Sequence, residues 1–406
     1  MNETKERNRS WEMVMSSFTD DLWIEIFLRL PIKSLLQLKS VSISWFSIIS
    51  SHRFAKSHLA ATTKDDEILI VHVGDSEDNN DGSFSLFHLS SGHILKNLKF
   101  PYSQGEYPFD RITSKLIGSD CGIVCVSVDV TYWRAVKKEL DIYLWNPATK
   151  HSKLIPPYTI PDNNLTFNIL GFGIDHIALD FKVVRVVSSN FSIRPFGVEV
   201  YSSNRNDWRK IEPKRIENPN CTNKFDVCFH GFLFATGSHG GMIAFDLNKE
   251  VFICDIKLPV SPFDGYHGFD ATRIRVFKDS IAFISYQYRD KINLWTLDDE
   301  ACFRGSGVEA SWTKMLSIDV GVRLKCVKGL FNNVQFLLNC KVGVHFMYNS
   351  DKKVTTSLHS PPDLLHGEVL SYTESLFSLV GSKRVKWIAS SSRLQDSLDF
   401  QAELDE

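Results

Sequence analysis

Three groups of residues in this sequence are of types that could do chemistry. The glycines of Gly237-Ser-His-Gly-Gly241 could bring backbone amides close to a phosphate group. Their spacing matches neither the dinucleotide-binding pattern nor the P-loop pattern, and no amphipathic helix follows them. We therefore predict a tight turn at this segment rather than a phosphate site.

The cysteines and histidines offer two further kinds of chemistry. Cys121 and Cys125 are separated by three residues, but no second His or Cys pair stands at metal-ligand spacing, and their apolar surroundings favour buried thiols over a zinc site. The 13 histidines form no fixed-spacing set with Ser, Cys or carboxylates, so we interpret His176 and His267 as turn residues. The sequence thus predicts no catalytic residue, metal or cofactor, although distant residues can converge in a fold.

Composition narrows the class of protein. A formal net charge of -2 over 406 residues gives no general signal for nucleic acid or for an anionic membrane. The polar start MNETKERNRS and the lack of a run of about 18 apolar residues predict neither a signal peptide nor a spanning helix. We expect a cytoplasmic and/or nuclear protein with a flexible N-terminus over residues 1-16 and a polar tail over residues 391-406.

The most apolar stretch is residues 18-49, where 18 of 32 positions are large aliphatic or aromatic side chains. Thr19 can cap a first helix, Pro31 ends it, a second helix runs from about Ile32 to Lys39, and Ser42 can cap a third. Units well below about 70 residues rarely bury enough surface alone, so we expect a partner protein to cover part of this one. An ordinary self-contained three-helix core is the alternative.

The order of these residues resembles the F-box: Asp-Leu, Glu-Ile, Leu-Arg-Leu-Pro, Lys-Ser-Leu-Leu, Val-Ser and Ser-Trp. It is similar to the plant subfamily that places this segment near the N-terminus. The resemblance implies a three-helix F-box over residues 17-60 that binds the Skp-family adaptor of cullin-RING ubiquitin ligases. The apolar positions that match the family, and are therefore implied to bind the adaptor, are Leu22, Ile26, Leu30, Pro31, Leu35, Val41, Trp45 and Ile49.

Beyond residue 65 the pattern changes to short β-rich runs separated by polar turns. A loose repeat recurs six times with a mean spacing of 52 residues between its apolar anchors, close to the period of about 50 for kelch-type propeller blades. We therefore predict an α+β multidomain chain whose residues 65-390 form a mainly-β, propeller-like domain of about six blades. A two-sheet β-sandwich array is the alternative. The anchors are Phe87, Trp145, Tyr201, Phe245, Trp295 and Met347.

The two ends of this β domain are predicted to meet. The run EVLSYTESLFSLV from Glu368 could pair with the early strand from Glu67 to Val71, which would close the ring and remove exposed sheet edges. The segments WNPATK, GFGID and DFKVVRVV also resemble the F-box-associated domain that follows the F-box in many plant proteins. That resemblance supports the ring.

Together the resemblances imply a substrate-recognition subunit of an SCF-type (Skp-cullin-F-box) E3 ubiquitin ligase, which is a receptor and not an enzyme. We expect an unknown protein target, and neither nucleic acid nor membrane, to bind loops at one rim of the ring. Two alternatives stay open: an adaptor-bound scaffold that does not deliver targets, and a ligand- or glycan-binding propeller capped by the helices. The aromatic and Arg loop residues chosen as target anchors, each of which could instead pack on its own blade, are Tyr107, Trp133, Arg194, Tyr266 and Tyr288.

Overall fold

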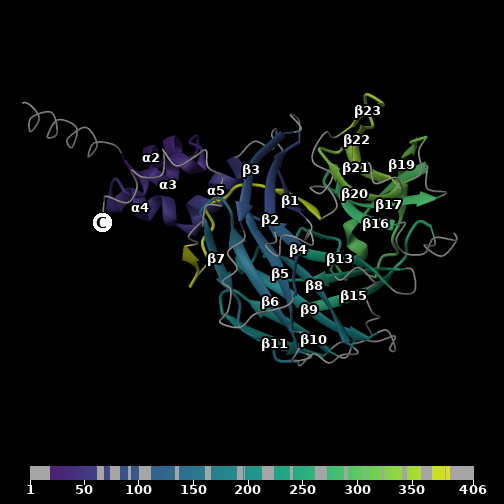
Figure 1. Ribbon diagram of the computed structural model, residues 1–406, viewed down its shortest axis with the longest axis horizontal. Coiled ribbons are helices and arrows are strands. Elements are labelled where there is room, and N and C mark those ends of the chain that lie inside the picture. The colour runs from purple at the N-terminus through teal and green to yellow at the C-terminus, as the bar shows by residue number, and fades with distance from the viewer. Residues whose placement is uncertain are drawn as a thin grey trace, which may run out of the picture.

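The computed structural model describes residues 19–61, 68–73, 83–89, 93–99, 111–132, 137–160, 166–189, 195, 197–212, 224–237, 241–260, 272–287, 291–305, 307–321, 324–340, 345–357, 368–379 and 381–384. Over these ranges four short helices come first, and almost everything after them is strand (Figure 1).

The helices begin where the sequence signals indicate. Thr19 is the N-cap of the first helix with an extended backbone, although its side chain makes no capping bond. Ser42 caps the third helix, because its side chain accepts a hydrogen bond from the Trp45 amide at 3.4 Å. A fourth helix follows that the apolar pattern did not predict. The bounds are Asp20–Phe27 (α2), Ile32–Leu38 (α3), Ile43–Ser50 (α4) and His52–Ala61 (α5).

Aromatic rings form the core of the helical unit. The Trp45 ring of α4 lies 4.8 Å from the Trp23 ring and 5.2 Å from the Phe27 ring, both on α2. The added helix α5 brings Phe54 to 6.4 Å from Phe27. His58 of α5 also hydrogen-bonds through Nε2 to the Leu30 carbonyl at 2.9 Å, so this helix holds the turn between α2 and α3 in place.

The described strands form six antiparallel sheets, which we number as blades 1 to 6 from the chain order of their second strands. In each blade the innermost strand is given first. Blade 1 consists of Val369–Tyr372 (β24), Ile68–Val73 (β1), Ser83–His88 (β2) and His93–Lys99 (β3). Blade 2 consists of Arg111–Asp120 (β4), Ile123–Tyr132 (β5), Lys137–Asn146 (β6), His151–Leu154 (β7) and Lys383–Arg384 (β25). Blade 3 consists of Thr166–Asp175 (β8), Asp180–Ser189 (β9), Gly197–Ser202 (β10) and Asp207–Ile211 (β11).

Blades 4 to 6 repeat the same order. Blade 4 consists of Val227–Phe229 (β12), Phe232–Thr236 (β13), Met242–Asp246 (β14) and Val251–Ile256 (β15). Blade 5 consists of Thr272–Phe277 (β16), Ser280–Gln287 (β17), Lys291–Leu297 (β18) and Trp312–Asp319 (β19). Blade 6 consists of Leu324–Phe331 (β20), Gln335–Cys340 (β21), His345–Asn349 (β22) and Val354–Ser357 (β23). Neighbouring innermost strands contact one another all the way round, so the blades form a ring.

The repeat predicted from sequence is confirmed strand by strand. Each of the six anchors lies on the third strand of its own blade, and all six side chains are buried. The ring also closes as predicted, because β24 pairs with β1 in a register that places Leu370 opposite Ile70. The fold is a six-bladed β-propeller, and the sandwich alternative is wrong.

Two glycines explain why GFGID suits the third blade. A Cβ at Gly171 would lie 2.6 Å from the Leu233 side chain, and one at Gly173 would lie 2.3 Å from the Cys228 sulfur. Both contacts come from the fourth blade. The glycines of β8 therefore allow the inner strands of blades 3 and 4 to approach closely.

After β24 the chain forms an irregular segment, residues 373–379, which we call the strap (yellow in Figure 1). Asn146, the asparagine of WNPATK, donates to the carbonyls of Ser375 and Phe377 at 3.0 and 2.9 Å. Phe377 also packs its ring 4.9 Å from that of His52 on α5. The strap thus joins the helical unit to blade 2, and both belong to one buried cluster.

Candidate functional site

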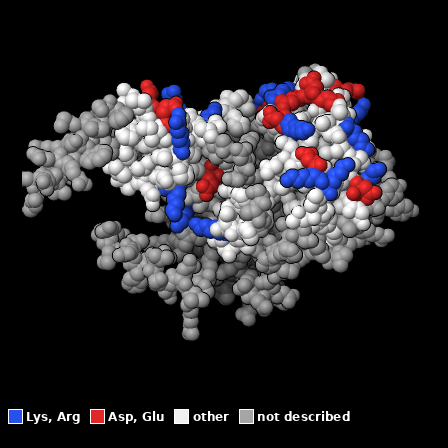
Figure 2. All heavy atoms as spheres, turned by 90° about the horizontal axis from the view of Figure 1, so that it is seen from above, with Lys and Arg blue, Asp and Glu red and all other residues white. Residues whose placement is uncertain are grey.

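The helical unit leaves large apolar side chains uncovered. Five such side chains are exposed: Ile43 is 90% exposed, and the exposed fractions of the other four side chains lie between 43% and 57%. Figure 2 shows this part of the molecule, at the left, as a largely uncharged surface. We call these residues the exposed apolar set: Leu22, Ile26, Val41, Ile43 and Phe46.

The structure divides the eight residues predicted to bind the adaptor into two groups. Leu22, Ile26 and Val41 belong to the exposed apolar set, Pro31 is exposed, and Leu30 is half-buried. The remaining three are buried in the helical core and can act on a partner only by holding the exposed residues in place. They are Leu35, Trp45 and Ile49.

Sequence reasoning did not place Ile43 and Phe46 among the site residues. Both lie on α4, three positions apart, so they share one side of that helix. Trp45 and Ile49 are four positions apart and define its buried side. The spacing within α4 was the signal that separates these two pairs.

The antiparallel order of the strands fixes which connections share an end of the propeller. Turns from first to second and from third to fourth strand lie at one end, whereas second-to-third connections and the links between blades lie at the other. Gly122 in the β4–β5 turn and Asn146 at the end of β6 both approach the strap, so the helices stand at the first end. We call these the helical end and the distal end.

The five residues predicted to contact a target all lie outside the described residues. The strands that flank their segments are described, however, and every one of these segments joins strand ends at the distal end. The segments link β3 to β4 (Tyr107), β5 to β6 (Trp133), β9 to β10 (Arg194), β15 to β16 (Tyr266) and β17 to β18 (Tyr288).

The segments singled out for chemistry take structural roles where they are described. The Gly237 amide donates to the Gly241 carbonyl at 2.7 Å across the β13–β14 connection, which agrees with the predicted turn, while residues 238–240 are outside the description. His176 is an exposed turn residue, and His267 also lies outside the description.

Of the two thiols predicted to be buried, one is fully buried and the other is half-buried. Cys125 is fully buried on β5, and Cys121 lies in the β4–β5 turn. Burial raises the pKa of both thiols, and the neighbouring Asp120 carboxylate raises that of Cys121 further. Among the described residues, no three His, Cys, Asp or Glu side chains gather as a metal site would require.

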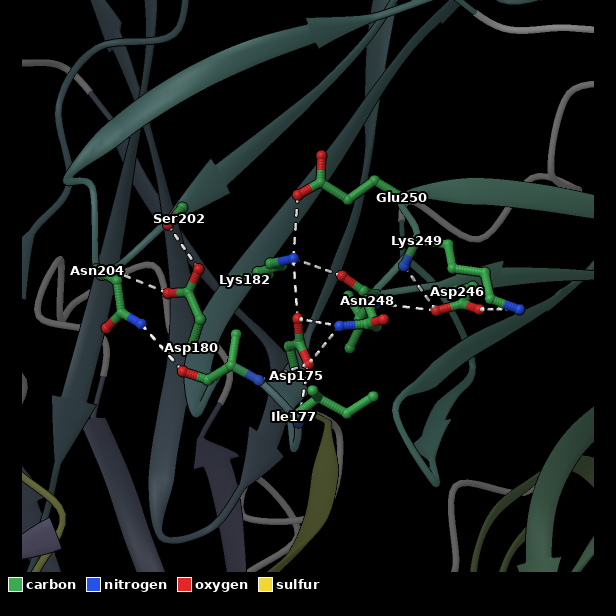
Figure 3. A network of polar contacts seen from close by, with 12 residues as sticks. Asp175, Ile177, Asp180, Lys182, Ser202, Asn204, Asp246, Asn248, Lys249 and Glu250 are labelled. Atoms are coloured by element: carbon green, nitrogen blue, oxygen red, sulfur yellow. Dashed lines mark hydrogen bonds and ion pairs between the residues drawn. The ribbon is translucent and has the colours of Figure 1, made fainter.

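A network of charged and polar side chains links blades 3 and 4 (Figure 3). The Lys182 ammonium lies 3.2 Å from Asp175 and 3.0 Å from Glu250, and it donates to the Leu247 carbonyl at 2.5 Å. Burial alone would raise the pKa of the Asp175 carboxyl, but hydrogen bonds from Ala178, Asn248 and others outweigh it and lower that pKa. These charged side chains pair with one another, and the ion pairs hold two blades together.

No helix in the described ranges combines the length and apolarity that crossing a bilayer requires.

Comparison with known proteins places the chain in a family. Residues 131–364 match the F-box associated beta propeller domain, and residues 15–57 match the F-box domain. The F-box/kelch-repeat protein At1g13200 of Arabidopsis thaliana is 24% identical over 76% of this chain and 73% of its own length. The F-box/kelch-repeat protein At3g23880 of Arabidopsis thaliana is 26% identical over 72% of this chain and 77% of its own length.

Among solved structures, apo AztD from Citrobacter koseri is 11% identical, covers 73% of this chain and 84% of its own, and has a TM-score of 0.34, a likeness too low to support any shared role. The two domain matches, the buried six-fold repeat and the helical unit agree with one another. The chain belongs to the family of F-box proteins that carry an F-box associated beta propeller domain.

Proposed function

We propose that this protein is the substrate-recognition subunit of an SCF-type (Skp-cullin-F-box) E3 ubiquitin ligase. Residues 17-60 dock on a Skp-family adaptor, and through it on the cullin-RING ligase, while the propeller, residues 65-390, holds a protein target. The protein works in the cytoplasm and/or nucleus, with no nucleic acid or membrane partner and no catalytic group of its own.

The exposed apolar set is the observation that carries this proposal. Full burial of one large apolar side chain contributes about 1.5–3 kcal/mol, so leaving five of them in water forgoes several kcal/mol of stability. A partner that covers them recovers this free energy as affinity. Apolar groups of this size on a small helical unit are characteristic of a protein-protein contact.

The catalytic contribution of such a receptor is positional. The adaptor fixes the helical end relative to the ligase, and the target is held by the propeller, so a target lysine and the ubiquitin thioester meet at high effective concentration. The strap and the cluster that joins the helices to blade 2 suit this role, because they fix the helical unit to the propeller.

Binding to a purified Skp adaptor tests the docking half of the proposal. A chain carrying Ile26→Asp and Val41→Asp places two charges in the exposed apolar set, and we expect its adaptor affinity to fall at least about a hundredfold. The matched control carries Ile177→Asp and Val354→Asp, which are also exposed apolar residues but lie on the propeller. Equal binding by wild type and both variants would refute the docking assignment.

A reconstituted ligase separates delivery of targets from scaffolding. Proteins captured by the full chain with its adaptor and identified by mass spectrometry should acquire ubiquitin when cullin-RING ligase and E2 conjugate are added. The same proteins should not be modified with the Ile26→Asp, Val41→Asp chain. Stable capture without modification would instead favour the scaffold alternative.

A further inference from the structure

The exposed side of helix α2 carries two apolar side chains between charges of opposite sign. Leu22 and Ile26 are four positions apart, so they lie one turn apart on the same side of the helix, and both are exposed. Asp20 and Asp21 are exposed in the first turn, and Arg29 is exposed just after the last turn. The helix is therefore acidic where it begins and basic where it ends.

The charges at the two ends of α2 have no partner in the part of the chain that the structure describes. No ion pair there involves Asp20, Asp21 or Arg29. Arg29 stays in line with the helix, because its amide donates to the Ile26 carbonyl at 3.2 Å and so continues the helical turn. These charges are therefore placed to meet charges of another molecule.

A helix with this pattern is complementary to a second copy of itself. When two such helices pack antiparallel about an axis halfway between Leu22 and Ile26, Leu22 of each copy meets Ile26 of the other. The same arrangement places Arg29 of each copy beside the first turn of the other, where Asp20 and Asp21 lie. A twofold contact repeats every favourable pair, so it gains two apolar contacts and two pairings of opposite charge at once.

The neighbouring surface of α4 suits the same contact. This helix packs on α2, with the Trp45 ring 4.8 Å from the Trp23 ring, and it carries no charged residue. Its exposed side chains Ile43 and Phe46 can therefore be covered without burying a charge. In Figure 1, α5 is the helix nearest the propeller, and α2 and α4 lie farther from the blades. A second copy that approaches α2 thus meets helices rather than blades.

We infer that, without its adaptor, this protein forms a twofold dimer through α2 and the exposed apolar set. The contact stands on the exposure, spacing and charges given above, and only its consequence rests on the proposed function. The dimer covers Leu22 and Ile26, which are also expected to bind the adaptor, so the receptor binds either a second copy or the adaptor. Because the contact is small, the dimer is weak and exchanges readily for the adaptor complex.

Sedimentation equilibrium of the full chain alone tests the dimer. Between about 1 and about 100 μM, we expect the average mass to rise from that of one chain toward that of two. An Arg29→Asp chain places like charges together at both ends of the contact and should associate at least about tenfold more weakly. The matched control is Arg53→Asp, which reverses an exposed charge on α5 and should dimerise like wild type. A wild-type chain that stays monomeric, or equal weakening in both variants, overturns the proposal.

Mixing two reversed-charge chains separates a specific twofold contact from misfolding. One chain carries Arg29→Asp, and the other carries Asp20→Arg with Asp21→Arg. Each chain alone brings like charges together and should remain monomeric, whereas the mixture has opposite charges at both ends and should dimerise like wild type. Mixing repairs neither a misfolded chain nor non-specific apolar association. A mixture without dimers, or wild-type particles that grow beyond two chains, overturns the α2 contact.

The purified Skp adaptor tests the consequence for the ligase. Added to the wild-type dimer, it should yield complexes that contain one receptor chain each. A particle with two receptor chains and an adaptor on each overturns the competition. A chain that dimerises but does not bind the adaptor refutes the docking proposal and leaves the twofold contact standing, so the two failures are separate results.

Discussion

At the scale of single residues, buried ion pairs link blades and loops to one another. Arg185 and Glu199 form the most enclosed ion pair described, with both side chains fully buried and 2.5 Å between Nη1 and Oε1. The remaining polar atoms are satisfied as well, because Glu199 accepts from the Thr159 amide at 3.0 Å and Arg185 donates to the Ile160 carbonyl at 2.8 Å. This pair fixes the link that enters blade 3.

Removing one member of that pair should be costly. In a Glu199→Ala chain the Arg185 guanidinium stays buried without its carboxylate, so we expect a loss of about 3–5 kcal/mol in the free energy of unfolding, measured with urea. The control is Glu309→Ala, which breaks the exposed pair with Lys257 and should change stability by less than about 1 kcal/mol. Similar small losses in both variants would contradict this role for Arg185.

We expect His72 to make the stability of the folded chain depend on pH. Its ring is buried on β1 and hydrogen-bonded through Nε2 to Ser114 Oγ at 2.8 Å. Burial lowers the pKa of this imidazole below 6.5, Lys224 lowers it further, and Glu368 opposes the shift only in part. As pH falls through 6.5, the unfolded chain therefore takes up a proton that the folded chain resists, and stability decreases.

A His72→Gln chain should lose that dependence. We expect the wild-type unfolding midpoint to fall between pH 7.5 and pH 5.5, and the variant midpoint to fall less, because Gln keeps a polar contact with Ser114 but does not titrate. Thermal unfolding across this pH range measures the difference. Parallel curves for the two chains would show that another group is responsible.

At the scale of elements, the turn from the third to the fourth strand is built in the same way in two blades, but in one of them it also binds the strap. In blades 2 and 6 an asparagine side chain accepts hydrogen bonds from two amides of the turn: Asn146 from Ala148 and Thr149, and Asn349 from Asp351 and Lys352. The amide group of Asn146 additionally donates to two strap carbonyls. Asn146 is buried, whereas Asn349 is half-buried.

These two turns provide a matched pair of substitutions. Asn146→Ala leaves buried strap carbonyls without donors, so we expect a loss of about 1–3 kcal/mol and faster amide exchange in residues 373–379. Asn349→Ala removes only the turn contacts and should leave the strap protected. Hydrogen exchange read by mass spectrometry distinguishes the two, and equal strap protection in both variants would refute the clamp.

Elements with strong periodicity were predictable, and those defined by tertiary contact were not. Trp145 and Phe245 revealed their blades because a large buried side chain recurs on each third strand. The sequence did not predict helix α5, because the polar residues His52, Arg53 and Lys56 interrupt its apolar pattern. Its buried residues are nevertheless at helical spacing: Phe54, Ala55 and His58. The strap has no internal repeat, since distant groups such as Asn146 satisfy it. Sequence reasoning also treated the F-box positions as one set, although the spacing within α4 separates its exposed from its buried side chains.

At the scale of the whole molecule, the ring depends on its C-terminal strand. β24 supplies the innermost strand of blade 1, pairs with β1 and contacts the innermost strands of blades 2 and 6. The same segment continues into the strap and then into β25, which pairs with β7. One stretch of chain therefore closes the propeller and also couples it to the helices.

A chain that ends after residue 367 should expose the consequences of losing this segment. Blade 1 then has a free inner edge, and the strap contacts of the helices are absent, so we expect aggregation and a broader, less cooperative unfolding transition than that of the full chain. A synthetic peptide of residues 368–385 should bind the truncated chain and restore cooperative unfolding, because β1 still offers its pairing edge and Asn146 its donors. A scrambled peptide is the control. If the truncated chain unfolds as cooperatively as the full chain without any peptide, closure by β24 is not what holds the ring together.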